Sequence, residues 1–93
     1  MSDFFQSYPK VPSQIRALLR DFGPAYTEQE LDEIREFLDH NEWGETLDLA
    51  VWILLKKDTE IPREFVLRCE SIATEMGASE AEYMVLLRDR AKG

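Results

Sequence analysis

The residue types that most often carry out chemistry in proteins are scarce in this chain. His40 is the only histidine and Cys69 the only cysteine, so neither a zinc site nor a Cys–His nucleophile pair can form within one copy. No glycine-rich loop of the kind that holds phosphate is present. We therefore expect a protein that is not an enzyme and that uses no cofactor.

One segment begins like a calcium-binding loop. Asp39, Asn41 and Gly44 stand at the first, third and sixth places of such a loop. The fifth place holds Trp43 and the twelfth holds Ala50, whereas calcium loops have an oxygen ligand and a bidentate glutamate there. We therefore expect no metal site in this segment.

Carboxylates are the one abundant reactive group, and they are concentrated in one stretch. Residues 28–48 contain nine acidic residues and one base, Arg35, whereas the remaining 72 residues contain ten acids and ten bases. The whole formal net charge of -8 therefore belongs to this stretch. The nine acids are Glu28, Glu30, Asp32, Glu33, Glu36, Asp39, Glu42, Glu45 and Asp48. Because we expect them on exposed helix faces, with no apolar pocket to shift a carboxyl pKa, acid–base catalysis is not indicated.

The acidic balance excludes two classes of partner. Proteins that bind nucleic acid or anionic membranes directly place Lys and Arg on phosphate groups, and this chain has 19 acids against 11 bases.

The longest apolar run, from Leu47 to Leu55, contains Asp48 and is too short to cross a bilayer. The first ten residues do not resemble a secretory signal. With a single cysteine, we expect a soluble protein of the reducing cytoplasm.

Glycine, proline and capping residues divide the chain into five segments, each with helical spacing of apolar residues. The predicted helices run from Pro12 to Asp21, from Thr27 to about His40, from the break at 41–44 to Lys57, from Ile61 and Pro62 to Gly77, and from a Ser79 cap onward. The expected fold is a small all-α bundle of about five helices, with residues 1–93 forming a single domain.

The second and third helices carry the acidic stretch. Thr27 and Glu30 form the pattern of a capping box, and the apolar face that follows lies opposite Glu28, Asp32, Glu36 and Asp39. The third helix is apolar on nearly every side, which is typical of a helix in the middle of a bundle. At 100° per residue, Glu45, Asp48 and Trp52 project to one side of it.

The clustered charge has two interpretations. It can be a solvated face that keeps a small protein in solution, or a surface that meets a basic partner. The helix dipole favours Glu28 and Glu30 near a helix start, but it does not explain Asp39 near the negative end. Trp52 is an interface anchor in the second interpretation and a core residue in the first, and Trp43 has the same two interpretations.

The chain resembles a known family in several short motifs. They are Leu31-x-x-Ile34-x-x-Phe37-Leu38, then Glu42-Trp43-Gly44-Glu45-x-Leu47, then Ile61-Pro62, and then Met76-Gly77. These motifs, over about half of the chain from Leu31 to Gly77, are similar to those of the small bacterial immunity proteins of the MafI type, which accompany polymorphic and contact-dependent growth inhibition toxins. The paired tyrosines of colicin nuclease immunity proteins are missing, since Tyr8, Tyr26 and Tyr83 are scattered.

The resemblance implies a cytoplasmic antidote that binds the C-terminal toxic domain of its cognate toxin, commonly a nuclease. The expected contacts are Asp32, Glu36, Asp39, Glu42, Glu45, Asp48 and Trp52. A second hypothesis is an acidic regulatory adaptor, or a mimic of nucleic acid, that binds a basic host protein. A third is a carrier protein with a prosthetic arm on Ser71, in the sequence Glu70-Ser71-Ile72.

Overall fold

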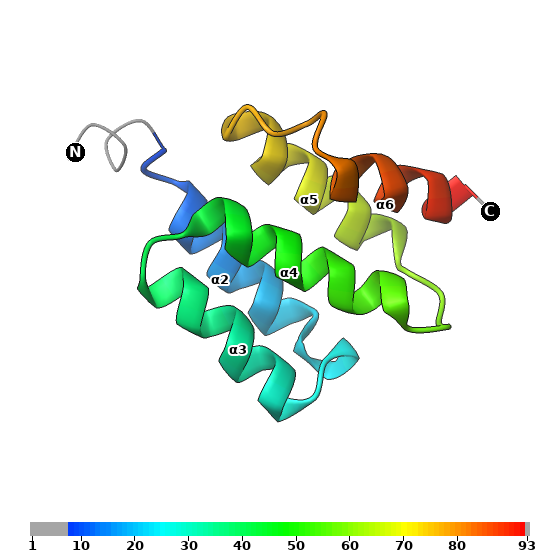
Figure 1. Ribbon diagram of the computed structural model, residues 1–93, viewed down its shortest axis with the longest axis horizontal. Helices are drawn as coiled ribbons and strands as arrows, with labels where there is room; N and C mark the ends of the chain where they lie inside the picture. Colours follow the sequence, from blue (N-terminus) through cyan, green and yellow to red (C-terminus); the bar gives the residue numbers. More distant parts are fainter. Residues whose placement is uncertain (1–7, 93) are drawn as a thin grey trace.

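The computed structural model describes residues 8–92, which form five α-helices and one short 3-10 turn, with no strand among them (Figure 1). The elements are α2 Val11–Asp21, η1 Gly23–Ala25, α3 Glu28–Asp39, α4 Trp43–Lys56, α5 Arg63–Glu75 and α6 Glu82–Lys92. The predicted all-α bundle of about five helices is confirmed. No helix in the described part of the chain is long and apolar enough to span a membrane.

Helix α4 lies at the centre of the bundle. It contacts α3 on one side and α6 on the other, and it also packs against α2 and α5 (Figure 1). The largest fully buried side chains come from all five helices and include Ile15, Leu18, Ile34, Leu47, Phe65, Met84 and Leu87. The predicted central position of this helix is therefore correct. One edge of α4 nevertheless stays partly open, since Leu49, Trp52 and Ile53 are only half-buried.

Local signals set several helix ends as predicted. Thr27 Oγ1 accepts a hydrogen bond from the Glu30 N–H at 3.1 Å, and Glu30 Oε1 accepts one from the Thr27 N–H at 2.8 Å, which completes the capping box of α3. Gly77 has a φ of 71°, and the Ala78 N–H donates to the Ala73 carbonyl at 2.7 Å. This is the left-handed ending that glycine favours, and it stops α5.

Two predicted helix starts are wrong. Asn41, with a φ of 61°, makes the break before α4, so Trp43 and Gly44 belong to its first turn rather than to the break. Helix α6 begins at Glu82, so Ser79 does not cap it. The Ser79 carbonyl instead accepts a hydrogen bond from Arg88 Nη2 at 2.6 Å, which holds this segment as a turn ahead of the helix.

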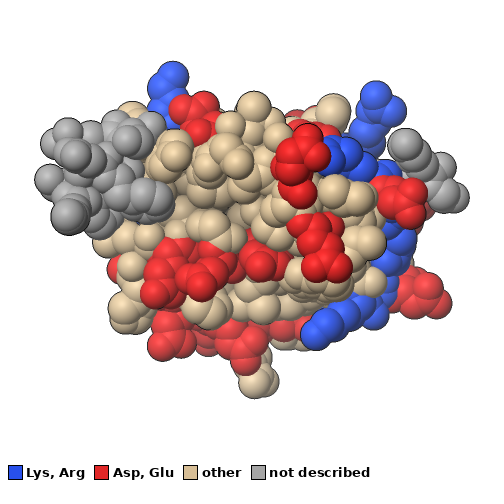
Figure 2. Space-filling view, turned by 45° about the horizontal axis from the view of Figure 1, so that its top comes forward, with Lys and Arg blue, Asp and Glu red and all other residues tan. Residues whose placement is uncertain are grey.

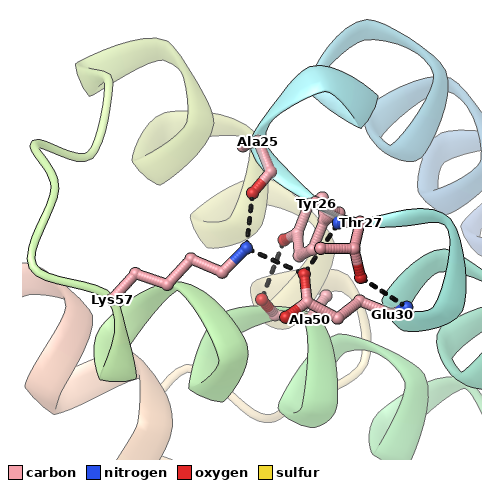
Figure 3. Close-up of polar contacts among 6 residues, drawn as sticks. All are labelled: Ala25, Tyr26, Thr27, Glu30, Ala50 and Lys57. Atoms are coloured by element: carbon pink, nitrogen blue, oxygen red, sulfur yellow. Dashed lines mark hydrogen bonds and ion pairs between the residues drawn. The ribbon is translucent and has the colours of Figure 1, made fainter.

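A group of polar contacts joins the start of α3 to the end of α4 (Figure 3). Lys57 Nζ donates to the Ala25 carbonyl and to Glu30 Oε1, both at 2.8 Å, and lies 5.6 Å from the centre of the Tyr26 ring. The buried Tyr26 hydroxyl donates to the Ala50 carbonyl at 2.8 Å. We call these five residues the Lys57 clasp. The clasp fixes α3 and α4 side by side and antiparallel (Figure 1).

Replacing Lys57 with methionine is expected to lower the free energy of unfolding in a pH-dependent way. The hydrogen bond from Lys57, followed by the one from the Thr27 backbone, lowers the pKa of Glu30 below its ordinary 4.5. A carboxylate with a lowered pKa in the folded state stabilises above its unfolded pKa, and this contribution is lost as pH falls through the folded pKa. In urea unfolding, the stability difference between wild type and Lys57→Met should therefore be largest near pH 7 and shrink in acid to the part due to the contacts of Lys57 with Ala25 and Tyr26.

The matched control is Lys56→Met, because Lys56 is exposed and makes no hydrogen bond or ion pair in the described part of the chain. This variant should match wild type at every pH. A difference between wild type and Lys57→Met that stays constant from neutral pH to well below pH 4.5 would contradict the role given to the Lys57–Glu30 ion pair.

Candidate functional site

The predicted contact residues lie on α3 and α4, most of them at the surface. Asp32, Glu36 and Asp39 of α3 are exposed, and so are Glu42, at the N-cap of α4, and Glu45 in its first turn. Asp48 and Trp52 are half-buried. Trp43 is 2% exposed, so it is a core residue. The structure thus separates the two tryptophans, and only Trp52 is accessible to a partner.

The bases of the protein do not neutralise the predicted carboxylates. In the described part of the chain the ion pairs are Arg20–Asp21, Lys57–Glu30, Arg68–Asp21 and Arg88–Glu70. None of them uses a predicted contact residue. Figure 2 shows carboxylates gathered across the lower half of one face, whereas Lys and Arg side chains lie at the top and the right-hand edge of the molecule, with further carboxylates beside them. Within residues 8–92, the predicted contact carboxylates therefore carry negative charge that no ion pair neutralises.

Three of these carboxylates surround the single histidine where α3 ends and α4 begins. His40 Nδ1 lies 2.7 Å from the Glu36 carbonyl oxygen. That hydrogen bond contributes most to raising the pKa of His40 above its ordinary value. The negative charges of Glu36, Glu42 and Asp39 raise this pKa further. Glu36, His40 and Glu42 also line an open groove of about 360 Å³. We call Glu36, Asp39, His40 and Glu42 the corner cluster.

Asp39 differs from the other members of the corner cluster because it also borders bases. It lines a groove of about 530 Å³ between α2 and α3, together with Arg16, Arg20 and Arg35. No ion pair joins Asp39 to these arginines in the described part of the chain. The negative surface therefore ends at Asp39 on the side that faces α2. From Asp39 it extends across α4.

A second cluster lies where α4 packs against the start of α6. Burial raises the pKa of the Asp48 carboxyl, the charge of Glu82 raises it further, and a hydrogen bond from Trp52 acts in the opposite direction. Tyr83 is 6% exposed, and its hydroxyl has no hydrogen-bond partner in the described part of the chain. Burial raises the pKa of Tyr83 to about 12, with Asp48 contributing. We call Asp48, Trp52, Glu82 and Tyr83 the α4–α6 site.

Sequence reasoning missed Glu82 and Tyr83 as members of a site. The apolar spacing correctly placed Tyr83 on the inward face of the last helix. It carried no signal for which residues of α4 that face would meet, because the register between two helices depends on side-chain packing across the core. The half-burial of Asp48 was missed for the same reason.

The metal-ligating and thiol groups of the described residues are not placed together to bind a metal ion. Within residues 8–92, no three His, Cys, Asp or Glu side chains are placed to hold a metal ion. Cys69 is fully buried, and burial raises the pKa of its thiol, so the reactive thiolate is disfavoured.

Comparisons of this chain with protein-family models, with curated proteins and with solved structures find no match.

The pKa of His40 is expected to report the negative potential of the corner cluster. In the double variant Glu36→Gln with Glu42→Gln, two charges disappear while the backbone carbonyl of residue 36 still bonds the ring. The pKa of His40 should therefore fall toward its ordinary 6.5. A proton NMR titration of the ring C–H signals measures it. Glu28→Gln, at the far end of α3, should leave the titration unchanged. If the double variant titrates like wild type, the carboxylates do not act together on His40.

Proposed function

We propose that this protein is a bacterial immunity protein, which binds the toxic domain of a cognate toxin and neutralises it through the acidic surface of α3 and α4. The toxic domain in this proposal is a basic nuclease. The observation that carries it is a set of exposed carboxylates that make no ion pair with the protein's own bases within the described residues, namely Asp32, Glu36, Asp39, Glu42 and Glu45.

The electrostatics suit such a partner. A nuclease presents Lys and Arg to the phosphates of its substrate, and carboxylates held on two packed helices are complementary to that surface. Steering by opposite charges raises association rates to roughly 10⁸ M⁻¹s⁻¹ or more at low salt. Neutralisation by binding needs no catalytic group, in agreement with the chemistry of the described residues.

The molecule is also large enough to supply its half of a stable protein–protein interface. A stable interface of standard size takes about 800 Å² from each partner, and the accessible surface of this protein is 5855 Å². Helices α3 and α4 contact each other along their length and present one face, so together they can supply such an area (Figure 1). The motif resemblance between Leu31 and Gly77 favours a toxin over a host regulator as the basic partner.

Co-expression tests the proposal directly. The partner is sought in the reading frame adjacent to the gene, which is expected to end in a nuclease-like toxic domain. Production of that domain alone should stop growth, and co-production of this protein should restore it. Growth arrest that persists at equal expression, with no complex on size-exclusion chromatography, would refute the immunity function. An adjacent regulator that forms the complex instead would identify the adaptor of the second hypothesis.

The site is tested by charge reversal. Asp32→Lys with Glu36→Lys should slow association with the toxic domain on the order of tenfold at low salt, because both carboxylates are exposed on the proposed face. Stopped-flow or biosensor kinetics measure the rate, and circular dichroism checks the fold.

The matched control is Glu64→Lys with Glu75→Lys on α5, which changes the net charge equally at two exposed positions of another helix. It should slow association much less. Equal slowing by the two double variants would mean that net charge alone matters, and it would reject the assignment of the contact surface to α3 and α4.

A further inference from the structure

The outer face of α5 and α6 carries apolar surface that the fold leaves open. Leu67 and Val85 are 50% and 48% exposed, and they are the exposed large apolar side chains of residues 8–92. Leu67 stands three residues before Glu70, on one face of α5. Val85 stands three residues before Arg88, on one face of α6. Because Arg88 Nη2 donates to Glu70 Oε1 at 3.0 Å, these two helix faces lie together on one side of the bundle.

A groove of about 540 Å³ lies at one end of this face, where the end of α6 passes the start of α5. Its apolar lining comes from Ile61, Val66 and Ala91. Leu67 lines the same groove, although half of its own surface is exposed. The face therefore combines an exposed leucine with an apolar hollow beside it.

The groove also carries two charges of opposite sign that are free. Glu60 and Arg63 both line it, and both are exposed. Neither forms an ion pair in the described part of the chain. The third charged residue of the groove, Arg88, is paired with Glu70. The groove thus offers one carboxylate and one guanidinium group to another molecule.

The face of α5 and α6 has no net charge, unlike the acidic surface. The two helices together contain five acids and five bases, whereas α3 contains six acids and one base. Two acidic surfaces repel each other, but two neutral faces can meet. Helices α5 and α6 lie on the other side of α4 from α3 (Figure 1). Their outer face can therefore be covered while α3 stays accessible.

These features make the face complementary to itself, and we propose that two copies of this protein associate through it about a two-fold axis. In such a dimer the same residues lie on both sides of the interface. Leu67 of each copy covers the apolar groove of the other, and Glu60 of each copy pairs with Arg63 of the other. A purely acidic or purely basic partner would satisfy only one of the two free charges, so a second copy is the better fit.

The size of the face limits the strength of the dimer. Helix α5 has 13 residues, which makes it about 20 Å long, and two neighbouring helices of this length present roughly 400 Å². A standard interface takes about 800 Å² from each partner. We therefore expect a weak, reversible dimer with a dissociation constant on the order of 100 µM.

Sedimentation equilibrium of the protein alone tests the dimer. Between about 10 µM and about 1 mM, the average mass should rise from the 10.9 kDa of one chain toward twice that value. Leu67→Glu should raise the dissociation constant at least tenfold, because it places a charge in an apolar interface. The matched control Gln29→Glu adds the same charge at an exposed position of α3, and it should dimerise like wild type.

Exchange of the two free charges tests the pairing across the two-fold axis. Glu60→Arg and Arg63→Glu should each weaken the dimer at least fivefold, because each places like charges opposite each other. In an equimolar mixture of these two variants, opposite charges face each other again. Dimers with one chain of each kind should then form about as strongly as the wild-type dimer. A role of these residues within one chain would not produce this recovery.

Three results would overturn the proposal. They are an average mass that stays at 10.9 kDa up to about 1 mM, a dimer equally strong in wild type, Leu67→Glu and Arg63→Glu, and a mixture of the charge variants without recovery. Circular dichroism checks the fold of each variant, and the charge exchange decides the matter if Leu67→Glu does not fold. Because these measurements use this protein alone, their outcome is independent of the immunity function.

Discussion

The acidic surface exists because α4 is held between α3 and α6 by apolar burial that exceeds the repulsion among like charges. Asp32 and Glu36 stand four residues apart on one face of α3, and such a pair destabilises a helix by roughly 0.2–0.5 kcal/mol. On the opposite face, Ile34 and Leu38 are buried, and each such side chain contributes about 1.5–3 kcal/mol. Burial therefore outweighs repulsion, and the Lys57 clasp then fixes how α3 lies along α4.

Several bases of the protein hold its own chain together. Lys57 closes the end of α4 onto the start of α3, and Arg90 binds three carbonyls around the segment that follows α4. Arg88 fastens α6 to Glu70 of α5. Arg88 and Arg90 are thereby held outside the acidic stretch, whereas Lys57 pairs with Glu30, one acid of that stretch that is not a predicted contact residue. The surface keeps its negative charge for this reason, in addition to the excess of acids in the sequence.

Much of the fold could be predicted from the sequence because its signals are local. The capping box of Thr27 and Glu30 acts within one helical turn, and the glycine ending at Gly77 needs only a positive φ. The start of α4 was misplaced because Asn41, rather than Gly44, adopts the left-handed conformation. Asparagine tolerates that conformation, but its presence in a sequence does not require it.

The candidate site was predictable only in part, since it combines local and long-range features. Helical periodicity correctly placed Asp32, Glu36 and Asp39 on the outer face of α3. It could not show that Asp48 meets Glu82 and Tyr83, because that meeting depends on how α6 docks on α4. It also gave Trp43 and Trp52 the same two interpretations, and only the packed structure separates them.

The electrostatic interactions of exposed and of half-buried carboxylates differ in how strongly salt screens them. At physiological ionic strength the Debye length is about 8 Å, so the exposed acids of α3 and the corner cluster act on an approaching partner only at short range. Asp48 lies half-buried beside Trp52 and Tyr83, where solvent screens a charge much less. Added salt should therefore weaken the electrostatic interactions of the exposed carboxylates far more than those of Asp48.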